Sequence, residues 1–189
     1  MEEIAKAYWL ARKMGFHNIN MDLIAGLPGE DSADMADTLK QIGALAPDSL
    51  TVHSLAIKRA AKMEFKDLES DAGETSRVMS DMISLAEDAA HRMGMSPYYL
   101  YRQKNIAGNF ENVGYAKKGK AGIYNILIME EKQTIIAAGA GASTKIVLKE
   151  PVPMPGSRKM THLLRSENVK DVAQYIERID EMIGRKRKL

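Results

Sequence analysis

Residues 18–29 constrain the fold more than any other stretch, because they join an apolar strand pattern to a turn built from glycine and proline. Asp22 stands inside the strand pattern, and the turn reads Gly26-Leu-Pro-Gly29. An ionisable group in an apolar strand is costly unless it is paired or hydrogen-bonded. Two explanations are open. Asp22 bonds nearby backbone amides as a structural cap, or it holds a ligand at the carboxyl edge of a sheet, where α/β proteins bind theirs.

Helical and strand patterns alternate through the first half of the chain. Helical periodicity over residues 2–14 and 31–45 precedes strand patterns over residues 18–25 and 49–57, and a longer helix is predicted over residues 74–93. This order of elements favours an α/β fold with parallel winding.

Two parallel strands with their covering helices cannot close a barrel by themselves. We therefore expect residues 1–95 to be the carboxyl-terminal end of a larger α/β unit whose beginning this truncated chain lacks. Beyond them, glycine-bearing loops replace helices between strand patterns, so residues 96–189 are predicted to be a mixed α+β region with antiparallel additions to the sheet. Its predicted strands cover residues 98–102, 123–129, 134–138 and 145–148, and its closing helix covers residues 168–183.

Further patterns leave a structural and a functional interpretation open. The small-residue loop over residues 138–144 either forms a tight turn or lets backbone approach a ligand closely. The loop predicted over residues 108–119 has a length that is commonly functional. Strand alternation places Tyr99 and Tyr101 on one face. His53 is either a hydrogen-bonded core histidine or the one histidine that faces a site.

Composition excludes several classes of protein. The 189 residues are 45% hydrophobic and 28% charged, and no apolar run approaches the roughly 20 residues of a membrane span. The start of the chain lacks the basic-then-apolar order of a signal peptide, so we expect a cytoplasmic protein. With a net charge of +2, the basic run at residues 185–188 is better explained as a solvated helix end than as a contact with nucleic acid or lipid.

Metal and redox chemistry are limited by the side chains that the chain lacks. Cysteine is absent, which excludes disulfides, Cys-ligated zinc and an iron–sulfur cluster held by this chain itself. The four histidines are never three or four residues apart, so no local metal site is predicted.

Three sequence blocks occur in a specific order. They are Asn20-Met-Asp-Leu-Ile-Ala-Gly-Leu-Pro-Gly29, then Ala116-Lys-Lys-Gly119 followed by Tyr124-Asn125, then Gly139-Ala-Gly-Ala-Ser-Thr144. Together they resemble the oxygen-independent coproporphyrinogen III oxidase family of radical S-adenosylmethionine (SAM) enzymes. The segments Tyr-Leu-Tyr-Arg-Gln-Lys-Asn and Glu-Asn-Val-Gly-Tyr are most similar to the Z-type coproporphyrinogen dehydrogenase branch, and the resemblance covers residues 2–184.

The resemblance implies the end of a partial βα radical SAM barrel followed by an accessory region that closes it. It also implies SAM and a [4Fe-4S] cluster as cofactors of the full-length protein, with cysteine ligands upstream that this chain does not contain. By residue match, Asp22 is the SAM-binding acid, Ala56 is a position where strand backbone meets the cofactor, and Ser143 is a contact from the glycine-rich loop. The resemblance assigns no catalytic residue and no metal ligand to this chain.

The implied reaction is the oxidative decarboxylation of coproporphyrinogen III propionates to vinyl groups in haem and porphyrin biosynthesis. It implies an oxidoreductase with a small tetrapyrrole substrate, no nucleic-acid or membrane partner, and an electron donor protein that the sequence does not identify. Because relatives include haem-trafficking proteins without oxidase activity, a haem- or tetrapyrrole-binding protein is the alternative. A nucleic-acid binder that uses the basic run is a third hypothesis.

The isolated chain is expected to be catalytically inactive, because an iron–sulfur cluster needs thiolate ligands and the sequence has no cysteine. Anaerobic reconstitution with iron and sulfide, followed by visible absorption spectroscopy, should show no cluster. A stoichiometric [4Fe-4S] spectrum from this chain alone would contradict the prediction that the cluster ligands lie elsewhere.

Overall fold

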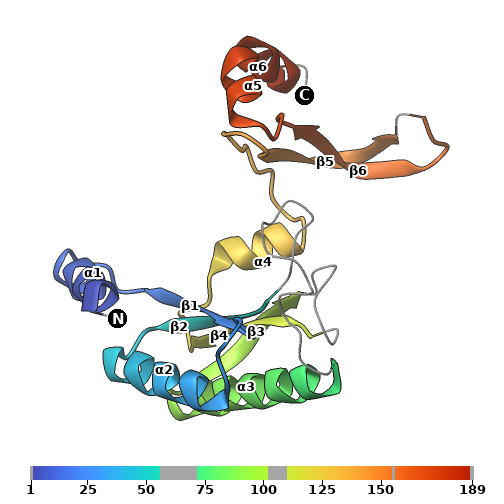
Figure 1. Ribbon diagram of the computed structural model, residues 1–189. Helices are drawn as coiled ribbons and strands as arrows, with labels where there is room; N and C mark the ends of the chain where they lie inside the picture. Colours follow the sequence, from blue (N-terminus) through green and yellow to red (C-terminus); the bar gives the residue numbers. More distant parts are fainter. Residues whose placement is uncertain (1, 56–71, 102–109, 155, 188–189) are drawn as a thin grey trace. The chain divides into compact units, whose positions relative to one another are not determined.

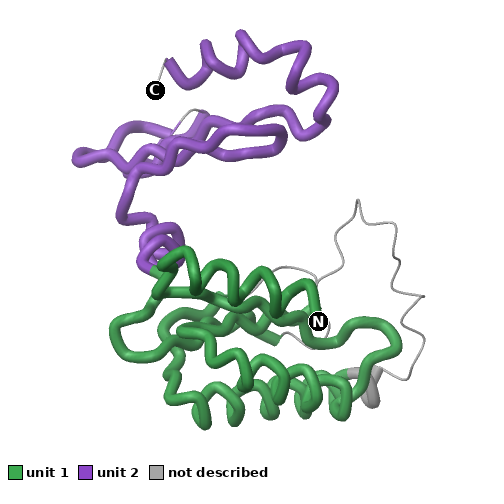
Figure 2. The backbone as a smooth tube through the Cα atoms, turned by 90° about the vertical axis from the view of Figure 1, so that its left-hand side faces the viewer, with its two compact units in different colours: residues 1–122 green, residues 123–189 purple. Residues whose placement is uncertain are grey.

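The chain divides into two compact units in the computed structural model (Figure 2). Unit 1 comprises Met1–Gly122 and unit 2 comprises Ile123–Leu189. The structure describes residues 2–55, 72–101, 110–154 and 156–187.

Unit 1 is built on a four-stranded sheet (Figure 1). Its elements are α1 (Glu2–Lys13), β1 (Asn20–Ala25), α2 (Ser32–Leu45), β2 (Ser49–Ser54), α3 (Ala72–Arg92), β3 (Met95–Tyr101) and β4 (Asn112–Lys117). The strands lie in the order β1-β2-β4-β3. β1 and β2 are parallel, whereas β4 is antiparallel to both β2 and β3. The predicted α/β content and the predicted antiparallel additions to the sheet are both present in this unit.

One face of this sheet carries the core of unit 1. Strand alternation places Leu23 of β1 and Val52 of β2 on the same side, where both are buried. α2 and α3 lie side by side against that face (Figure 1). Because burial contributes about 25 cal/mol per Å² of apolar surface, this packing fixes which face of the sheet is left for other groups. The helices contribute the buried side chains of Met35, Leu39, Ile42, Met79, Met82 and Ala86.

Helix α2 begins and ends where its sequence indicates. Asp31 is the N-cap, and its side chain accepts hydrogen bonds from the backbone N–H groups of Ala33 and Asp34. The Asp34 side chain accepts one from the Asp31 backbone, which completes a capping box. At the other end Ala46 has a left-handed φ of 55°, and Pro47 follows it, so the helix cannot continue.

The segment predicted as a long functional loop contains a strand. Residues 112–117 form β4, which lies between β2 and β3, so the loop predicted over residues 108–119 was wrong there. β4 contains a glycine, which weakens a strand pattern in sequence, and it is defined here by its partners on both sides. The predicted boundary after residue 95 also falls within this sheet, because β3 begins at Met95 and the units divide after Gly122.

Unit 2 contains a two-stranded sheet and three helices among its described residues. Its elements are α4 (Ile123–Met129), β5 (Ser143–Pro153), β6 (Met160–Glu167), α5 (Val172–Glu177) and α6 (Ile179–Arg187), with β5 antiparallel to β6. The strand predicted over residues 123–129 was wrong, since these residues form α4; a short apolar run fits either state. The strand predicted over residues 134–138 is reduced to one bridge, between Ile135 and Lys145.

The closing helix of the sequence prediction is present as α5 and α6, separated at Arg178. The basic run ends α6, and two of its residues bond within unit 2. Arg185 Nη2 lies 2.5 Å from Glu181 Oε1, and Lys186 Nζ donates to the Ala137 carbonyl. Among the residues that the structure describes, no helix is long and apolar enough to span a bilayer.

The buried carboxylate of Asp48 connects α1 with the segments that precede β1 and β2. Asp48, which precedes β2, has a side chain only 12% exposed and lies 2.7 Å from the guanidinium of Arg12 in α1. Its Oδ2 also accepts a hydrogen bond of 3.0 Å from the Ile19 N–H, just before β1. Burial acts to raise the pKa of Asp48, but the bond from Ile19 and the charge of Arg12 outweigh it, so the pKa lies below its ordinary value of 3.8.

We expect Asp48→Asn to lower the free energy of unfolding by about 1.5 to 3 kcal/mol near neutral pH, because it removes the charge from hydrogen-bonded contacts. A carboxylate whose pKa is lower in the folded state stabilises the fold above its unfolded pKa and ceases to do so as pH falls through the folded pKa. Urea unfolding between neutral pH and strongly acidic pH measures this, with exposed Asp81→Asn as the control. A difference between wild type and Asp48→Asn that stays constant down to the lowest pH would contradict the prediction.

Candidate functional site

The second face of the unit 1 sheet, away from α2 and α3, carries polar side chains. The register places Asp22 of β1 opposite Thr51 of β2, and Thr51 opposite Gly114 of β4. Gly114 in turn lies opposite Tyr99 of β3. Residues opposite one another share a face, so these four form a row across the sheet. We call the polar face the set of Asn20, Asp22, Thr51, His53, Tyr99 and Gly114.

Asp22 presents an accessible carboxylate on the polar face. Its side chain is 64% exposed, and His53 Nε2 lies 3.9 Å from its Oδ1. Asn20 Nδ2 donates to the same oxygen at 2.6 Å. Within the described part of the chain no backbone N–H donates to this carboxylate, so the structure does not support the cap explanation. His53 faces Asp22 and its side chain is 30% exposed, so it is not enclosed in the core.

The position of Asp22 along its strand differs from the expectation. The ligand-holding explanation placed it at the carboxyl edge of the sheet, but it is the third of six residues in β1. The turn glycine that follows β1 has a separate, structural explanation. Gly26 has a φ of +84°, and a Cβ built there would lie 2.1 Å from the Met79 Cε atom of α3. Packing therefore accounts for Gly26, whereas it does not account for Asp22.

The Tyr99 ring lies over strand β4 and reaches β2. A Cβ built on Gly114 would lie 2.0 Å from Tyr99 Cε1, so the ring occupies the space that a side chain at residue 114 would need. Its hydroxyl forms a side-chain hydrogen bond with Thr51. Burial raises the pKa of Tyr99, and the Asp22 charge adds to the increase, so the phenol keeps its proton at neutral pH.

A second tyrosine extends the aromatic surface of β3. The rings of Tyr99 and Tyr101 are stacked, with centroids 6.4 Å apart and planes 8° apart, which confirms that the two share a face. Tyr98 meets Tyr99 edge to face at 4.8 Å. A carboxylate, an imidazole and stacked phenol rings on one accessible face can bind a polar, partly aromatic ligand.

Ala56, the second predicted cofactor contact, lies outside the described residues. Ser143, the third, is the first residue of β5 in unit 2, and its Oγ donates to Glu167 Oε1 at 2.9 Å. Asp22 and Ser143 thus belong to different units. The structure brings Asp22 together with Asn20 and His53 and places Ser143 beside Glu167.

The glycine-rich loop before Ser143 is held by the segment that follows β6. Asn168 Nδ2 donates to the Gly139 carbonyl at 2.7 Å, and the Asn168 N–H donates to the Ala142 carbonyl at 2.9 Å. The Gly139 N–H donates to the Tyr175 hydroxyl at 3.2 Å. Gly139 and Gly141 have φ values of +104° and +69°, so both glycines are required by backbone conformation. A tight turn is therefore enough to explain why this loop contains glycines.

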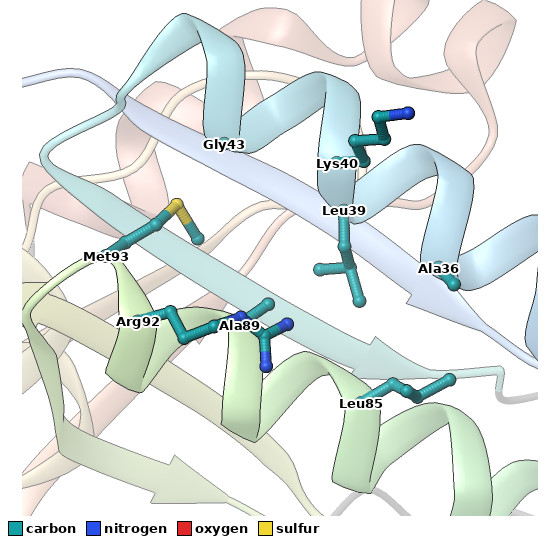
Figure 3. Close-up of a pocket in the computed structure, with 8 residues that line it drawn as sticks. All are labelled: Ala36, Leu39, Lys40, Gly43, Leu85, Ala89, Arg92 and Met93. Atoms are coloured by element: carbon teal, nitrogen blue, oxygen red, sulfur yellow. The ribbon is translucent and has the colours of Figure 1, made fainter.

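A separate hollow of about 310 Å³ lies between α2 and α3 (Figure 3). Leu39 and Met93 point into it, and Lys40 and Arg92 are among the residues that line it. It contains none of the predicted site residues. In the described part of the chain, no group of three His, Asp or Glu side chains is placed to hold a metal ion.

The sequence analysis did not identify three residues of the polar face as candidates: Asn20, Thr51 and Gly114. The alternation of polar Asn20 and Asp22 along β1 was a signal that the sequence contained. No comparable signal joins Thr51 and Tyr99, because their contact depends on the pairing of β2 and β3 with β4.

No protein-family model matches this chain. It is 43% identical over 189 residues to the oxygen-independent coproporphyrinogen-III oxidase-like protein HemZ of Bacillus subtilis, covering 98% of this chain and 35% of that protein. It is 30% identical over 130 residues to the oxygen-independent coproporphyrinogen III oxidase of Helicobacter pylori, covering 62% of this chain and 28% of that protein.

A solved structure shares the fold. The coproporphyrinogen III oxidase HemN of Escherichia coli, described as a radical SAM enzyme, superposes with a TM-score of 0.60 at 19% identity, over 95% of this chain and 38% of that one. The chain thus spans about a third of the length of the curated relatives named above. These findings confirm the family resemblance inferred from the sequence blocks.

We expect Gly114→Ala to lower the free energy of unfolding by about 1 to 3 kcal/mol, because the added Cβ displaces the Tyr99 ring. Gly43→Ala is the matched control, since a Cβ there meets nothing within 4 Å, and alanine is favoured in a helix. Thermal unfolding measures both. In a Tyr99→Ala background the cost of Gly114→Ala should largely disappear; an unchanged cost would show that the ring is not the cause.

Proposed function

We propose that this chain is part of an oxygen-independent coproporphyrinogen III oxidase, from its similarity over 98% of its length to an oxidase-like protein and over 62% of its length to an oxidase of that name. The enzyme would convert propionate side chains of coproporphyrinogen III into vinyl groups. The single observation that carries this proposal is the 43% identity over 98% of the chain. Each conversion would release CO₂ and remove one hydrogen atom and one electron; the hydrogen atom would pass to the radical derived from SAM and the electron to a further acceptor.

The sheet of unit 1 is, in this proposal, part of the βα barrel that encloses the reaction. Two observations support it. The polar face bears accessible groups that a barrel interior would use, and α1 exposes large apolar side chains that further structure would cover. In α1, Trp9 is 56% exposed and Leu10 59%, and Phe16, which follows α1, is 62% exposed.

SAM is the cofactor that the polar face fits. Its bound form supplies the radical that removes a hydrogen atom from the substrate propionate. The Asp22 carboxylate, 64% exposed, is an acceptor for hydroxyl or amine groups of such a ligand. We assign Asp22, Ala56 and Ser143 to cofactor binding. What this chain contributes is orientation of the ligand and exclusion of water from it.

The iron–sulfur cluster does not fit the residues of this chain. Its usual ligands are cysteine thiolates, and the sequence contains none. The role we assign to the chain is therefore limited to binding and orientation, and the enzyme must be tested as the full-length protein.

Product analysis distinguishes the oxidase from a haem- or tetrapyrrole-binding protein. The full-length protein that contains this chain is incubated anaerobically with a reduced cluster, SAM and coproporphyrinogen III, and the porphyrins are separated after oxidation. Vinyl products support the proposal. Binding of tetrapyrrole with no vinyl product and no SAM cleavage would favour the alternative.

In the same full-length protein, Asp22→Asn is expected to weaken SAM binding at least about tenfold, because the charge-assisted part of the interaction is lost. Its melting temperature should change little, since the side chain is exposed. Asp81→Asn, on the helix-covered side of the sheet, is the matched control and should bind SAM normally. Normal SAM binding by Asp22→Asn together with easier unfolding would show that the acid has a structural role.

A further inference from the structure

Three side chains from three strands lead to the Asp22 carboxylate. Asn20 Nδ2 donates to Asp22 Oδ1 at 2.6 Å. The Thr51 hydroxyl donates to Asn20 Oδ1 at 3.2 Å and accepts from Asn20 Nδ2 at 3.1 Å. The Tyr99 hydroxyl bonds to Thr51 in turn. The four residues lie on β1, β2 and β3, and the contacts cross the sheet above Gly114 of β4.

The chemistry of a carboxylate fixes the direction of the bond from Asn20 to Asp22. A carboxylate only accepts hydrogen bonds, so the Asn20 amide must present its NH₂ group to Asp22. This leaves Asn20 Oδ1 as an acceptor for the single hydrogen of the Thr51 hydroxyl. The Tyr99 hydroxyl meets the same Thr51 hydroxyl from β3. Asn20 and Thr51 thus hold each other by bonds in both senses, while Asn20 also holds Asp22, and such connected bonds can strengthen one another.

Two members of the series, Thr51 and Asp22, differ in their exposure to solvent. Thr51 is buried, at 2% exposure, and its hydroxyl is bonded on both sides. The Asp22 side chain at the end of the series remains 64% exposed. An exposed carboxylate loses rotamer freedom when a ligand binds, unless a neighbour already holds it. Asn20 and His53 both contact Oδ1, and no residue in the described part of the chain bonds to Oδ2, so Oδ2 is the oxygen left for a ligand.

We propose that Asn20, Thr51 and Tyr99 are positioning residues, which hold the Asp22 carboxylate so that Oδ2 is presented to the hydroxyl or amine groups of the ligand. Gly114 is part of the same arrangement, because only a residue without a side chain leaves room for the Tyr99 ring to cross β4 and reach Thr51. This inference rests on the proposed function, in that SAM is taken as the ligand.

The experiment measures SAM affinity of the full-length protein by equilibrium dialysis. Asn20→Ala should weaken binding about fivefold to tenfold, the effect of removing a hydrogen bond to a charged group. Thr51→Val keeps the shape of the side chain and should weaken binding about threefold, whereas Thr51→Ser restores the hydroxyl and should bind within about twofold of wild type. Tyr99→Phe keeps the ring over Gly114 and should weaken binding about twofold to threefold.

Coupling to Asp22 separates positioning from general stability. In an Asp22→Asn background, Asn20→Ala should weaken SAM binding by less than about twofold more, because the group that it positions is already changed. Additive losses in the double variant would overturn the proposal, as would equal affinities of Thr51→Val and Thr51→Ser. If Asn20→Ala does not fold, Tyr99→Phe and the two Thr51 variants decide the question, since they preserve packing.

The outcomes distinguish this inference from the proposed function. If Asp22→Asn weakens SAM binding but Asn20→Ala and Tyr99→Phe do not, the positioning role is wrong and the SAM assignment of Asp22 stands. If Asp22→Asn itself binds SAM normally, the site assignment fails, and the positioning role fails with it.

Discussion

Strand β2 pairs in parallel with β1 and antiparallel with β4, and the register of these two pairings is the constraint on which unit 1 depends. Leu50 and Val52 face α2 and α3, so Thr51 between them must face the other way. A slip of one residue would bury Thr51 against the helices and expose both apolar neighbours. The apolar packing on one face therefore decides which polar groups meet on the other.

Because apolar packing and polar groups occupy opposite faces, the sheet has a packed core on one side and accessible polar side chains on the other. The core fills the helix-covered face with methionine, leucine and alanine side chains, and Asp48 fixes the approach of α1 and the start of β1 on the amino side of β2. Neither feature uses a residue of the polar face. A carboxylate can then remain exposed on that face without a cost to the core, provided that neighbouring donors hold it.

The relation between Asp22 and its neighbours shows what a family resemblance adds and what it leaves out. The sequence blocks indicated the family, and the comparisons confirmed it. The resemblance named Asp22 as a contact, but it gave no physical reason for Asn20, Thr51, Tyr99 or Gly114 to matter to it. Those reasons are hydrogen-bond geometry and the clearance above a glycine.

The sequence by itself determined the helices and strands with strong periodicity, such as α2, α3, β1 and β2, because local hydrophobic patterns and caps are encoded in neighbouring residues. It also determined that this chain cannot ligate an iron–sulfur cluster through thiolates, since the sequence contains no cysteine. Only the tertiary structure decided that residues 112–117 are a strand and residues 123–129 a helix, because short segments take their state from their partners. It alone joined Tyr99 to Thr51, since a contact across three strands depends on register, which no local pattern contains.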